Sequence, residues 1–559
     1  MTRSASLVLL AVFGVGVFLT GLELMITAVA LPAIILDFSK DQIFAFVELR
    51  KASWVINAYL LAYVVTMPLA GRLTDLWGAR RLFLAALAVF VVGSALAGRA
   101  QSLDELIAAR VVQALGGGVL VPVGTAAASH LFEGHSRPRA LGVIGALTFL
   151  GMAAGPFLGA AILDAVHVDL ALANLGMADD GLVQTLAPAW RWVFYVNVPI
   201  GIVALVLGWA ASAGWDTPTH PGRVDVLGGV VFSIAHAAGL IGLTLTGAGS
   251  QALGGIDPTL IAGVLLGVAL LGTVLTIVVG LRRADPYLDP RLFRSPVFSS
   301  AVVVSLLTGY AFATAIIGGA VFVDRVLYGG PDQQRLALGS LAAATAVGAL
   351  VSGFAIRVLP LRLVTCAGLA ASAGALLALS RSTSATPIEV VAVVLAVFGL
   401  GFGLTVTPRS TAAVESVGRR AFGAASATVT VARMVGMALG LAILTAYGST
   451  TIELLYDRVY ATPDAYRQFI PAELRDRPLR DGLVVQALET WAAGEAARTL
   501  VGIFLAAAAL TAAAVPPALA MGARPRMLQP IDETASHPGT STRRGEPEGS
   551  DDVEPTLAL

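Results

Sequence analysis

The stretch Gly71-Arg-Leu-Thr-Asp-Leu-Trp-Gly-Ala-Arg-Arg81 lies between two long apolar runs and decides how the chain is organised. A polar segment of this length is too short to be a domain, so we read it as a turn between two helices. Its glycines permit a sharp backbone turn and a close approach of two helix ends. Its aspartate can accept hydrogen bonds from a helix N-terminus, and its arginines can anchor the turn at a cytoplasmic membrane face. An ordinary basic loop would explain the arginines, but not the glycine spacing or the single acid.

The composition is that of a polytopic membrane protein. Of the 559 residues, 57% are hydrophobic and only 13% are charged, whereas soluble domains carry about 25% charged residues. Apolar runs of about 20 residues recur along nearly the whole chain, so the spanning elements are helices and not strands. The net charge is zero, which argues against binding to nucleic acid.

Residue usage excludes several kinds of chemistry. Cys366 is the only cysteine, so an intrachain disulfide is impossible. Lys40 and Lys51 are the only lysines, and neither can serve as a Walker A lysine in a glycine-rich loop. No metal-ligand or His/Asp cluster is visible. We therefore expect no cofactor, no metal and no enzyme activity.

Hydropathy predicts an all-α fold of about fourteen spans, each about 20 residues long. Two six-helix halves with two inserted helices fit this count. The predicted division is an N-terminal half at 1–212, two inserted helices with linkers at 213–296, a C-terminal half at 297–521 with a long external loop at 449–497, and a disordered cytoplasmic tail at 522–559.

A weak internal repeat agrees with two parallel halves. Gly353 and Arg362 have the same spacing as Gly71 and Arg80 in the opening stretch. The acid of that stretch is replaced by Arg357, so the second copy is degenerate. Its position, where a second half would carry it, favours duplication over chance.

The distribution of arginine predicts the orientation. Arginines gather in alternate loops, and the positive-inside rule places those loops and both termini in the cytoplasm. An even number of spans agrees with this. Because the chain is rich in arginine and poor in lysine, it is typical of a GC-rich bacterial genome, so we expect a multi-pass protein of the bacterial inner membrane.

The segment 449–497 is too long and too charged for a tight turn. The spacing of Leu483, Val484, Leu488 and Trp491 predicts that the last helix continues outward beyond the bilayer. The segment is either an extension that docks a partner or guides substrate, or a tolerated surface insertion.

Glu23 is the main candidate for chemistry, because it lies inside the first apolar span. A charged side chain near the bilayer centre costs about 2.5–3.5 kcal/mol on insertion scales, and such residues are functional by default. Burial penalises the charged form, which suits a proton carrier. The alternative is a glutamate that is hydrogen-bonded within the bundle for structural reasons.

Arg110 and Arg433 are the other deeply placed charges. Arg110 either takes part in proton coupling or pins its helix to the carbonyl groups of a neighbour. Arg433 either pairs with Asp75 across the two halves or extends its head group to the cytoplasmic interface.

Several motifs resemble those of one family. The opening stretch resembles the loop between the second and third helices of the major facilitator superfamily, which implies a cytoplasmic gate that includes Gly71, Asp75, Gly78, Arg80 and Arg81, with Arg433 opposite. A second group of residues resembles the antiporter motif of proton-driven exporters: Gly142, Gly151, Gly155, Pro156 and Gly159. As a set of small residues it would also serve as a packing face. The stretch from Arg110 to Gly118 resembles the motif of the fourth helix, with Ala114 in place of a glycine, and implies a coupling role for Arg110.

The setting of Glu23, from Leu22 to Pro32, resembles the first helix of fourteen-helix drug:proton antiporters, which carry an acid there. Further stretches are similar to the mycobacterial-type triacylglyceride and multidrug exporters, which work with a lipid-carrying lipoprotein. That branch places an acid shortly before the antiporter motif, where this chain has Thr148 and Phe149.

These observations predict a proton-coupled secondary exporter of amphiphilic or lipidic compounds that works by alternating access. Its expected partners are protons, a hydrophobic or lipidic substrate, membrane lipids and an external lipid-carrying lipoprotein, with no nucleic acid. A multidrug:proton antiporter of small hydrophobic drugs and a non-transporting membrane scaffold or sensor remain open alternatives.

Overall fold

The computed structural model describes residues 3–38, 54–133, 136–166, 186–217, 219, 224–246, 257–417, 421–460, 465–478 and 481–522. In these ranges fourteen helical segments are long and apolar enough to cross a membrane, and no strand occurs. The predicted all-α membrane fold is therefore confirmed. The predicted tail lies, from residue 523 on, outside the described residues.

The first bundle contains six spans, the last of which is made of two helices. Its helices are α1 (Arg3–Phe38), α3 (Trp54–Trp77), α4 (Ala79–Arg99), α5 (Leu103–Leu131), α6 (Arg137–Ala165), α9 (Ala189–Tyr195) and α10 (Asn197–Ala211). Helix α1 packs along α6, and α5 packs along both α3 and α4. Helices α9 and α10 meet at Val196, so the first residue of α10 is Asn197.

The start of α5 is fixed by its own sequence. The Ser102 hydroxyl accepts a hydrogen bond from the Glu105 backbone N–H at 3.2 Å, and the Glu105 carboxylate accepts one from the Gln101 N–H at 2.8 Å. This reciprocal cap satisfies two donors at the helix end. It sets the register of α5, so that Arg110 follows about two turns further on.

The second bundle also has six spans. Its helices are α13 (Pro296–Val321) with the π-helical turn η5 (Phe322–Val326), α14 (Pro331–Ala355), α15 (Leu361–Leu379), α16 (Ile388–Glu415), α17 (Phe422–Tyr460), and α18 (Gly482–Ala513) with the short α19 (Val515–Leu519). Helix α16 packs along α14 and α15, and α13 packs along α17.

The two bundles meet through α6 with α14, and through α17 with α3 and α5. An aromatic cluster also crosses this boundary. The Phe149 ring of α6 lies 5.3 Å from the rings of both Phe312 and Phe402, which stack on each other at 4.3 Å. Packed aromatic groups of this kind hold the two bundles in register without any covalent link.

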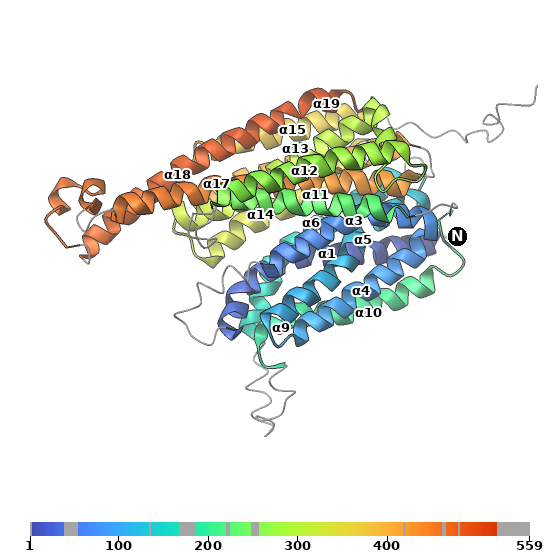
Figure 1. The fold of residues 1–559 in the computed structure, drawn as a ribbon, viewed down its shortest axis with the longest axis horizontal. Helices are drawn as coiled ribbons and strands as arrows, with labels where there is room; N and C mark the ends of the chain where they lie inside the picture. Colours follow the sequence, from blue (N-terminus) through green and yellow to red (C-terminus); the bar gives the residue numbers. More distant parts are fainter. Residues whose placement is uncertain are drawn as a thin grey trace, which may run out of the picture. The chain divides into compact units, whose positions relative to one another are not determined.

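The inserted helices α11 (Val226–Leu245) and α12 (Pro258–Arg282) form a hairpin that runs side by side along the second bundle (Figure 1). Only 22% and 11% of their apolar windows are buried, against 72% for α5, so both helices present most of their surface to lipid. Asp225 caps the start of α11 and forms an ion pair with Arg283 after the end of α12 at 2.7 Å. The Tyr287 hydroxyl donates to the Val65 carbonyl of α3 at 2.6 Å and ties the hairpin to the first bundle.

A cavity of about 660 Å³ lies between this hairpin and α17. Its lining is mostly apolar and includes Phe232, Leu243, Ile277 and Leu439. His236 also lines it and stacks on Phe232 with ring centroids 5.7 Å apart, in agreement with a packed helix residue.

The segment predicted as a long external loop, 449–497, contains helical residues in its described parts. Within 449–497, the first residues continue α17 as far as Tyr460, and α18 begins at Gly482. The short 3₁₀ turns η7 (Ala465–Phe469) and η8 (Ala472–Leu474) lie between them. One unbroken helix covers Leu483 to Ala513, as the apolar spacing predicted, and its continuation beyond the bilayer stays a prediction. The charges that suggested a loop lie on the two helix ends and on the short connection between them.

Candidate functional site

Glu23 lies on α1 in the middle of the first bundle and its side chain is 0% exposed. Its carboxylate forms an ion pair with the Arg110 guanidinium of α5, which is 1% exposed. Leu22 and Ile26 beside it are buried core residues, so the carboxylate is enclosed by apolar packing. Two opposite charges in such a place stabilise each other only if further hydrogen bonds satisfy their remaining atoms.

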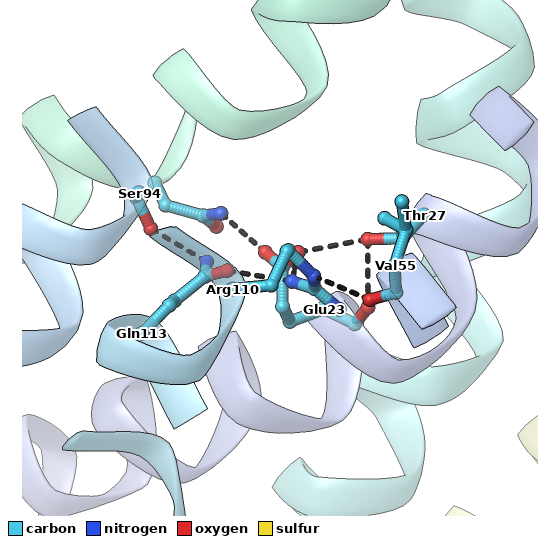
Figure 2. A network of polar contacts seen from close by, with 7 residues as sticks. Glu23, Thr27, Val55, Ser94, Arg110 and Gln113 are labelled. Atoms are coloured by element: carbon cyan, nitrogen blue, oxygen red, sulfur yellow. Dashed lines mark hydrogen bonds and ion pairs between the residues drawn. The ribbon is translucent and has the colours of Figure 1, made fainter. Parts of the chain in front are cut away.

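Those further hydrogen bonds come from two other positions. The Asn197 amide donates to the second carboxylate oxygen of Glu23 at 2.6 Å, and the Thr27 hydroxyl donates to the first at 2.8 Å. Figure 2 shows the Glu23 carboxylate between Thr27 and Arg110. Asn197 is positioned by the break between α9 and α10, since it is the first residue of α10. The carboxylate therefore has partners from three helices.

Arg110 is held just as fully. Its Nε donates to the Val55 carbonyl at 3.2 Å, and a terminal nitrogen donates to the Gln113 side chain at 2.5 Å. Gln113 in turn donates to the Ser94 hydroxyl at 2.7 Å (Figure 2). The guanidinium also lies 4.0 Å from the centre of the Tyr59 ring, in cation–π geometry. Arg110 thus contacts a backbone carbonyl of the neighbouring helix α3 and also the acid, while its role in proton coupling stays a prediction.

Two polar atoms beside this network have no hydrogen-bond partner within the described residues. They are the Tyr59 hydroxyl and the Asn197 amide oxygen, and both are buried. An unsatisfied buried polar group costs about 1–3 kcal/mol. The hydrogen bonds are therefore complete around the two charges and incomplete at the edge of the network.

The opening stretch of the sequence lies at the contact between the two bundles. A Cβ atom on Gly71 would lie 2.7 Å from the Gly423 carbonyl oxygen of α17, so no larger residue fits there without movement. The Asp75 carboxylate accepts backbone hydrogen bonds from Gly423 and Ala424, in the first turn of α17. A carboxylate at a helix N-terminus satisfies free N–H groups and interacts favourably with the helix dipole. The predicted helix N-terminus for Asp75 is therefore that of α17, in the other bundle.

Gly78 and the two arginines form the break between α3 and α4. Gly78 has φ +86°, and a Cβ there would lie 2.4 Å from the Asp216 carboxylate. Asp216 accepts from the Arg80 backbone N–H at 2.9 Å, and the Arg80 side chain donates to Ser212 at 2.7 Å. Arg81 follows in the first turn of α4. This turn is therefore fixed to the segment after α10, within its own bundle.

Arg433 does not form an ion pair with Asp75, which corrects that expectation for the described structure. The reason is distance along α17, because Arg433 lies ten residues, or about 15 Å, beyond the turn that Asp75 contacts. Arg433 is only 9% exposed, so its head group does not extend to the interface either. Its guanidinium lies 5.5 Å from the centre of the Phe149 ring.

The predicted antiporter motif gives α6 two close contacts. Cβ atoms added to Gly151, Gly155 and Gly159 would lie within 2.2, 2.7 and 3.2 Å of atoms of α1. A Cβ on Gly142 would lie 3.1 Å from the Ala349 carbonyl of α14, in the other bundle. Pro156 lies inside the helix between these contacts. Helix α6 thus packs closely on the helix that carries Glu23 and on the opposite bundle.

Some residues of the site were not assigned a role by the sequence. Asn197 is separated from Glu23 by 174 positions, so no local spacing could reveal the contact. Gln113 is three residues after Arg110 on the same helix face, and this spacing could have indicated a partner. Among the described residues, no group of three metal-ligating side chains comes together.

Twelve of the fourteen candidate spans in the described residues form two bundles of six, and the other two form the hairpin of α11 and α12. An acid and an arginine are buried between helices of the first bundle, an arrangement typical of a polytopic membrane transporter. Residues 13–441 match the family model of the Major Facilitator Superfamily. The chain belongs to the major facilitator superfamily, and it is a transporter and not an enzyme.

Two relatives are similar over most of their length. A triacylglyceride transporter of Mycolicibacterium hassiacum is 30% identical over 482 residues, which cover 84% of this chain and 85% of the relative. A triacylglyceride transporter of Mycolicibacterium smegmatis is 31% identical over 431 residues, with 74% and 71% covered. The crystal structure of a bacterial homologue of the human lysosomal transporter Spinster, inward-facing and unoccupied, matches with a TM-score of 0.56 at 17% identity. It covers 93% of this chain and 99% of that chain, and it shows the shared fold.

Proposed function

We propose that this transporter is a proton-coupled secondary exporter of amphiphilic or lipidic compounds. The observation that carries the proposal is the ion pair between Glu23 and Arg110, which is fully buried in the first bundle. An intramembrane carboxylate with a single cationic partner can change the charge of its site by taking up one proton.

The coupling follows from electrostatics. When Glu23 takes a proton from outside, Arg110 loses its counter-charge, and an uncompensated buried charge is costly. A conformation that hydrates or re-pairs Arg110 then becomes favoured, and the population shifts toward it. Release of the proton on the other side restores the ion pair, and substrate leaves in the opposite direction. Asn197 and Thr27 hold the carboxylate so that only its protonation state changes.

The gate in this proposal is the contact of Asp75 with the first turn of α17. The close approach of Gly71 and Gly423 and the hydrogen bonds to Asp75 favour closure at this end of the molecule. Opening must separate α3 from α17, so these hydrogen bonds and close contacts must break together. The Arg80 and Arg81 turn, fixed to the segment after α10, moves with the first bundle.

The proposed substrate class rests on the names of similar proteins and on the residues that line the cavity beside α11 and α12. Relatives that match most of this chain are named triacylglyceride transporters. The cavity beside α11 and α12 is mostly apolar, as a lipid or a hydrophobic drug requires. The helical extension formed by the end of α17 and the start of α18 is a natural place for an external lipid-carrying lipoprotein to dock.

We also propose the bacterial inner membrane as the location, with both termini in the cytoplasm. The basis is the concentration of arginine in alternate loops. In that orientation the contact of Gly71 with Gly423 closes the cytoplasmic side. Cysteine labelling of Trp77→Cys from each side of the membrane, in a Cys366→Ser background, tests the orientation.

Transport in proteoliposomes under an imposed pH difference tests the function. A labelled triacylglyceride and a fluorescent cationic drug are offered separately to wild type and to Glu23→Gln. Glu389→Gln, the same change at an exposed glutamate, is the matched control. We expect the lipid to move against its gradient in wild type and control, and not in Glu23→Gln.

Each other result has a defined meaning. Movement of the drug alone would replace the lipid exporter with a multidrug antiporter. Normal transport by Glu23→Gln would overturn the coupling role of this acid. Absence of transport of both substrates, with and without an external lipid carrier, would favour the scaffold alternative.

A further inference from the structure

A second, smaller cavity lies where the two bundles meet. It has a volume of about 40 Å³ and is lined from α5, α6, α13, α16 and α17. Unlike the cavity beside α11 and α12, it is rich in polar side chains. The ones that matter here are Arg409, Arg433 and Ser305.

Both arginines are buried, with 2% and 9% of their side chains exposed. The Arg409 Nε donates to the Thr405 carbonyl at 3.0 Å, and a terminal nitrogen donates to the Thr308 hydroxyl. The Arg433 Nε has no hydrogen-bond partner, and neither has the Ser305 hydroxyl, which is 0% exposed. Within the described residues, neither guanidinium has a carboxylate at ion-pair distance.

This arrangement is electrostatically incomplete. Removing a charge from water is costly unless an opposite charge and hydrogen bonds compensate for it. Arg110 in the first bundle has such compensation, whereas Arg409 and Arg433 have only neutral partners and the faces of Phe402 and Phe149. Two positive charges around one cavity, with a free N–H and a free hydroxyl, lack an anion.

We propose that this cavity binds the anionic head group, a carboxylate or phosphate, of an amphiphilic substrate. A planar guanidinium suits both groups, because its N–H donors match their oxygen atoms. On the measure used for this volume, one water needs about 10–15 Å³, so about 40 Å³ has room for a group of about three non-hydrogen atoms. A head group fits there, whereas a drug-sized ligand needs about 300–1,000 Å³. The inference rests on the proposed function and adds to its substrate class, beside neutral lipids, amphiphiles with an anionic head group.

The position of the site gives it a role in the transport cycle. Arg433 belongs to the second bundle, and it lies over Phe149 of the first. Val406 and Arg409 of α16 face Ile144 and Thr148 of α6 across the same cavity. A bound anion would neutralise charge at the boundary between bundles, so binding favours the state in which the bundles are together there.

Equilibrium binding tests the proposal without any proton gradient. The probe is radiolabelled decanoate, offered to the purified full-length protein in nanodiscs, with decanol as an uncharged competitor of equal chain length. We expect Arg433→Gln to weaken decanoate binding by about tenfold to a hundredfold, as for the loss of one charged hydrogen-bonding partner. Arg357→Gln, the same change at an exposed arginine, should bind as wild type does. Arg409→Gln serves as the second variant if Arg433→Gln does not fold.

The proposal is overturned if decanol competes as well as unlabelled decanoate, or if neither arginine variant affects binding. A small free anion is the alternative to an anionic head group as the negative charge that occupies this cavity. If labelled chloride occupies the site and acetate displaces it as well as decanoate does, the site binds small anions and the head-group assignment is wrong.

Failure here is separable from failure of the proposed function. The arginine variants are measured by equilibrium binding without a proton gradient, and the proposed function is measured by transport under a pH difference. If decanoate does not bind while triacylglyceride still moves under a pH difference, only the anion site is wrong. If decanoate binds as expected and no substrate moves, only the proton-coupled exporter is wrong.

Discussion

Two buried arginine sites of this transporter differ in whether the arginine has an acidic partner. Arg110, inside the first bundle, has an acid, a backbone carbonyl and a glutamine as partners. Arg433, between the bundles, has an aromatic ring and an Nε without a partner. A site within a bundle that moves as one body can supply its own counter-charge permanently. A site between two moving bodies, where a ligand must enter and leave, is suited to a counter-charge that comes and goes.

The largest expected effect is a loss of stability when the ion pair between Glu23 and Arg110 is broken. Arg110→Ala leaves the Glu23 carboxylate buried without its cation, so we expect it to lower the free energy of unfolding by about 3–5 kcal/mol. Chemical unfolding in mixed micelles measures this, with Arg357→Ala at an exposed position as the control. The double variant Glu23→Gln with Arg110→Gln should lose less than the sum of the single changes, by about 0.5–3 kcal/mol. Additive losses would mean that the two side chains do not depend on each other.

Removal of the charge from the site of Arg433, which has no acidic partner among the described residues, should change the free energy of unfolding in the opposite direction. Arg433→Met removes a charge that has no acidic partner, so we expect the free energy of unfolding to rise by about 1–3 kcal/mol, part of the desolvation penalty of one ion. The same unfolding assay measures it in the absence of an amphiphile. Added decanoate should stabilise wild type and not the variant, because a ligand stabilises only the state that binds it. Destabilisation by Arg433→Met without ligand would show that this arginine is already compensated, and the comparison would fail.

A larger residue at the contact between the bundles should have a smaller effect, which is on the equilibrium between the open and closed conformations. Gly71→Val places atoms against the Gly423 carbonyl, and overpacking of about 1–3 kcal/mol shifts the open and closed populations roughly tenfold or more. Electron-paramagnetic distance measurements can follow it, with labels at Trp77→Cys and Val358→Cys in a Cys366→Ser background. We expect a longer distance in Gly71→Val. Gly374→Val, where an added Cβ meets nothing within 4 Å, should leave the distance unchanged.

The sequence was sufficient for features that depend on composition and local spacing. Apolar runs predicted fourteen spans, and the structure has fourteen candidates in its described residues. The position of Glu23 inside an apolar run predicted a buried acid, since the neighbouring residues already form an enclosed surface. The glycine spacing in α6 predicted close helix contacts, because small residues at one face leave only the backbone for a neighbour to meet.

The sequence was not sufficient for contacts between distant segments. The pairing of Asn197 with Glu23 depends on where α10 begins relative to α1, and no periodicity encodes that. One of the two interpretations of Arg433 was an ion pair with Asp75. Ten residues of α17 separate Arg433 from the first turn of this helix, where backbone N–H groups bind Asp75 instead. The length and charge of 449–497 predicted a long segment between two spans, and apolar spacing predicted that part of it belongs to the last helix. The spacing did not show that the preceding helix, α17, also extends into this segment as far as Tyr460.

The smallest expected effect concerns a carboxylate in water, in contrast to Glu23. Asp481 caps the start of α18, where its carboxylate accepts from the Leu483 N–H at 2.9 Å, and this hydrogen bond lowers its pKa below the usual 3.8. A lowered pKa means that the cap stabilises the helix at pH values above the ordinary pKa, and that this stabilisation is lost as pH falls through the pKa of the folded state.

We expect Asp481→Ala to speed amide hydrogen exchange in the first turn of α18 at neutral pH. Asp476→Ala, at an exposed acid in the preceding turn, is the control. Wild type should approach the behaviour of the variant as pH falls below 3.8 and through the lowered folded-state pKa, since protonation removes the same acceptor. Equal exchange in wild type and Asp481→Ala at neutral pH would mean that the extension is held by its apolar contacts alone, such as those of the buried Val484 and Tyr466.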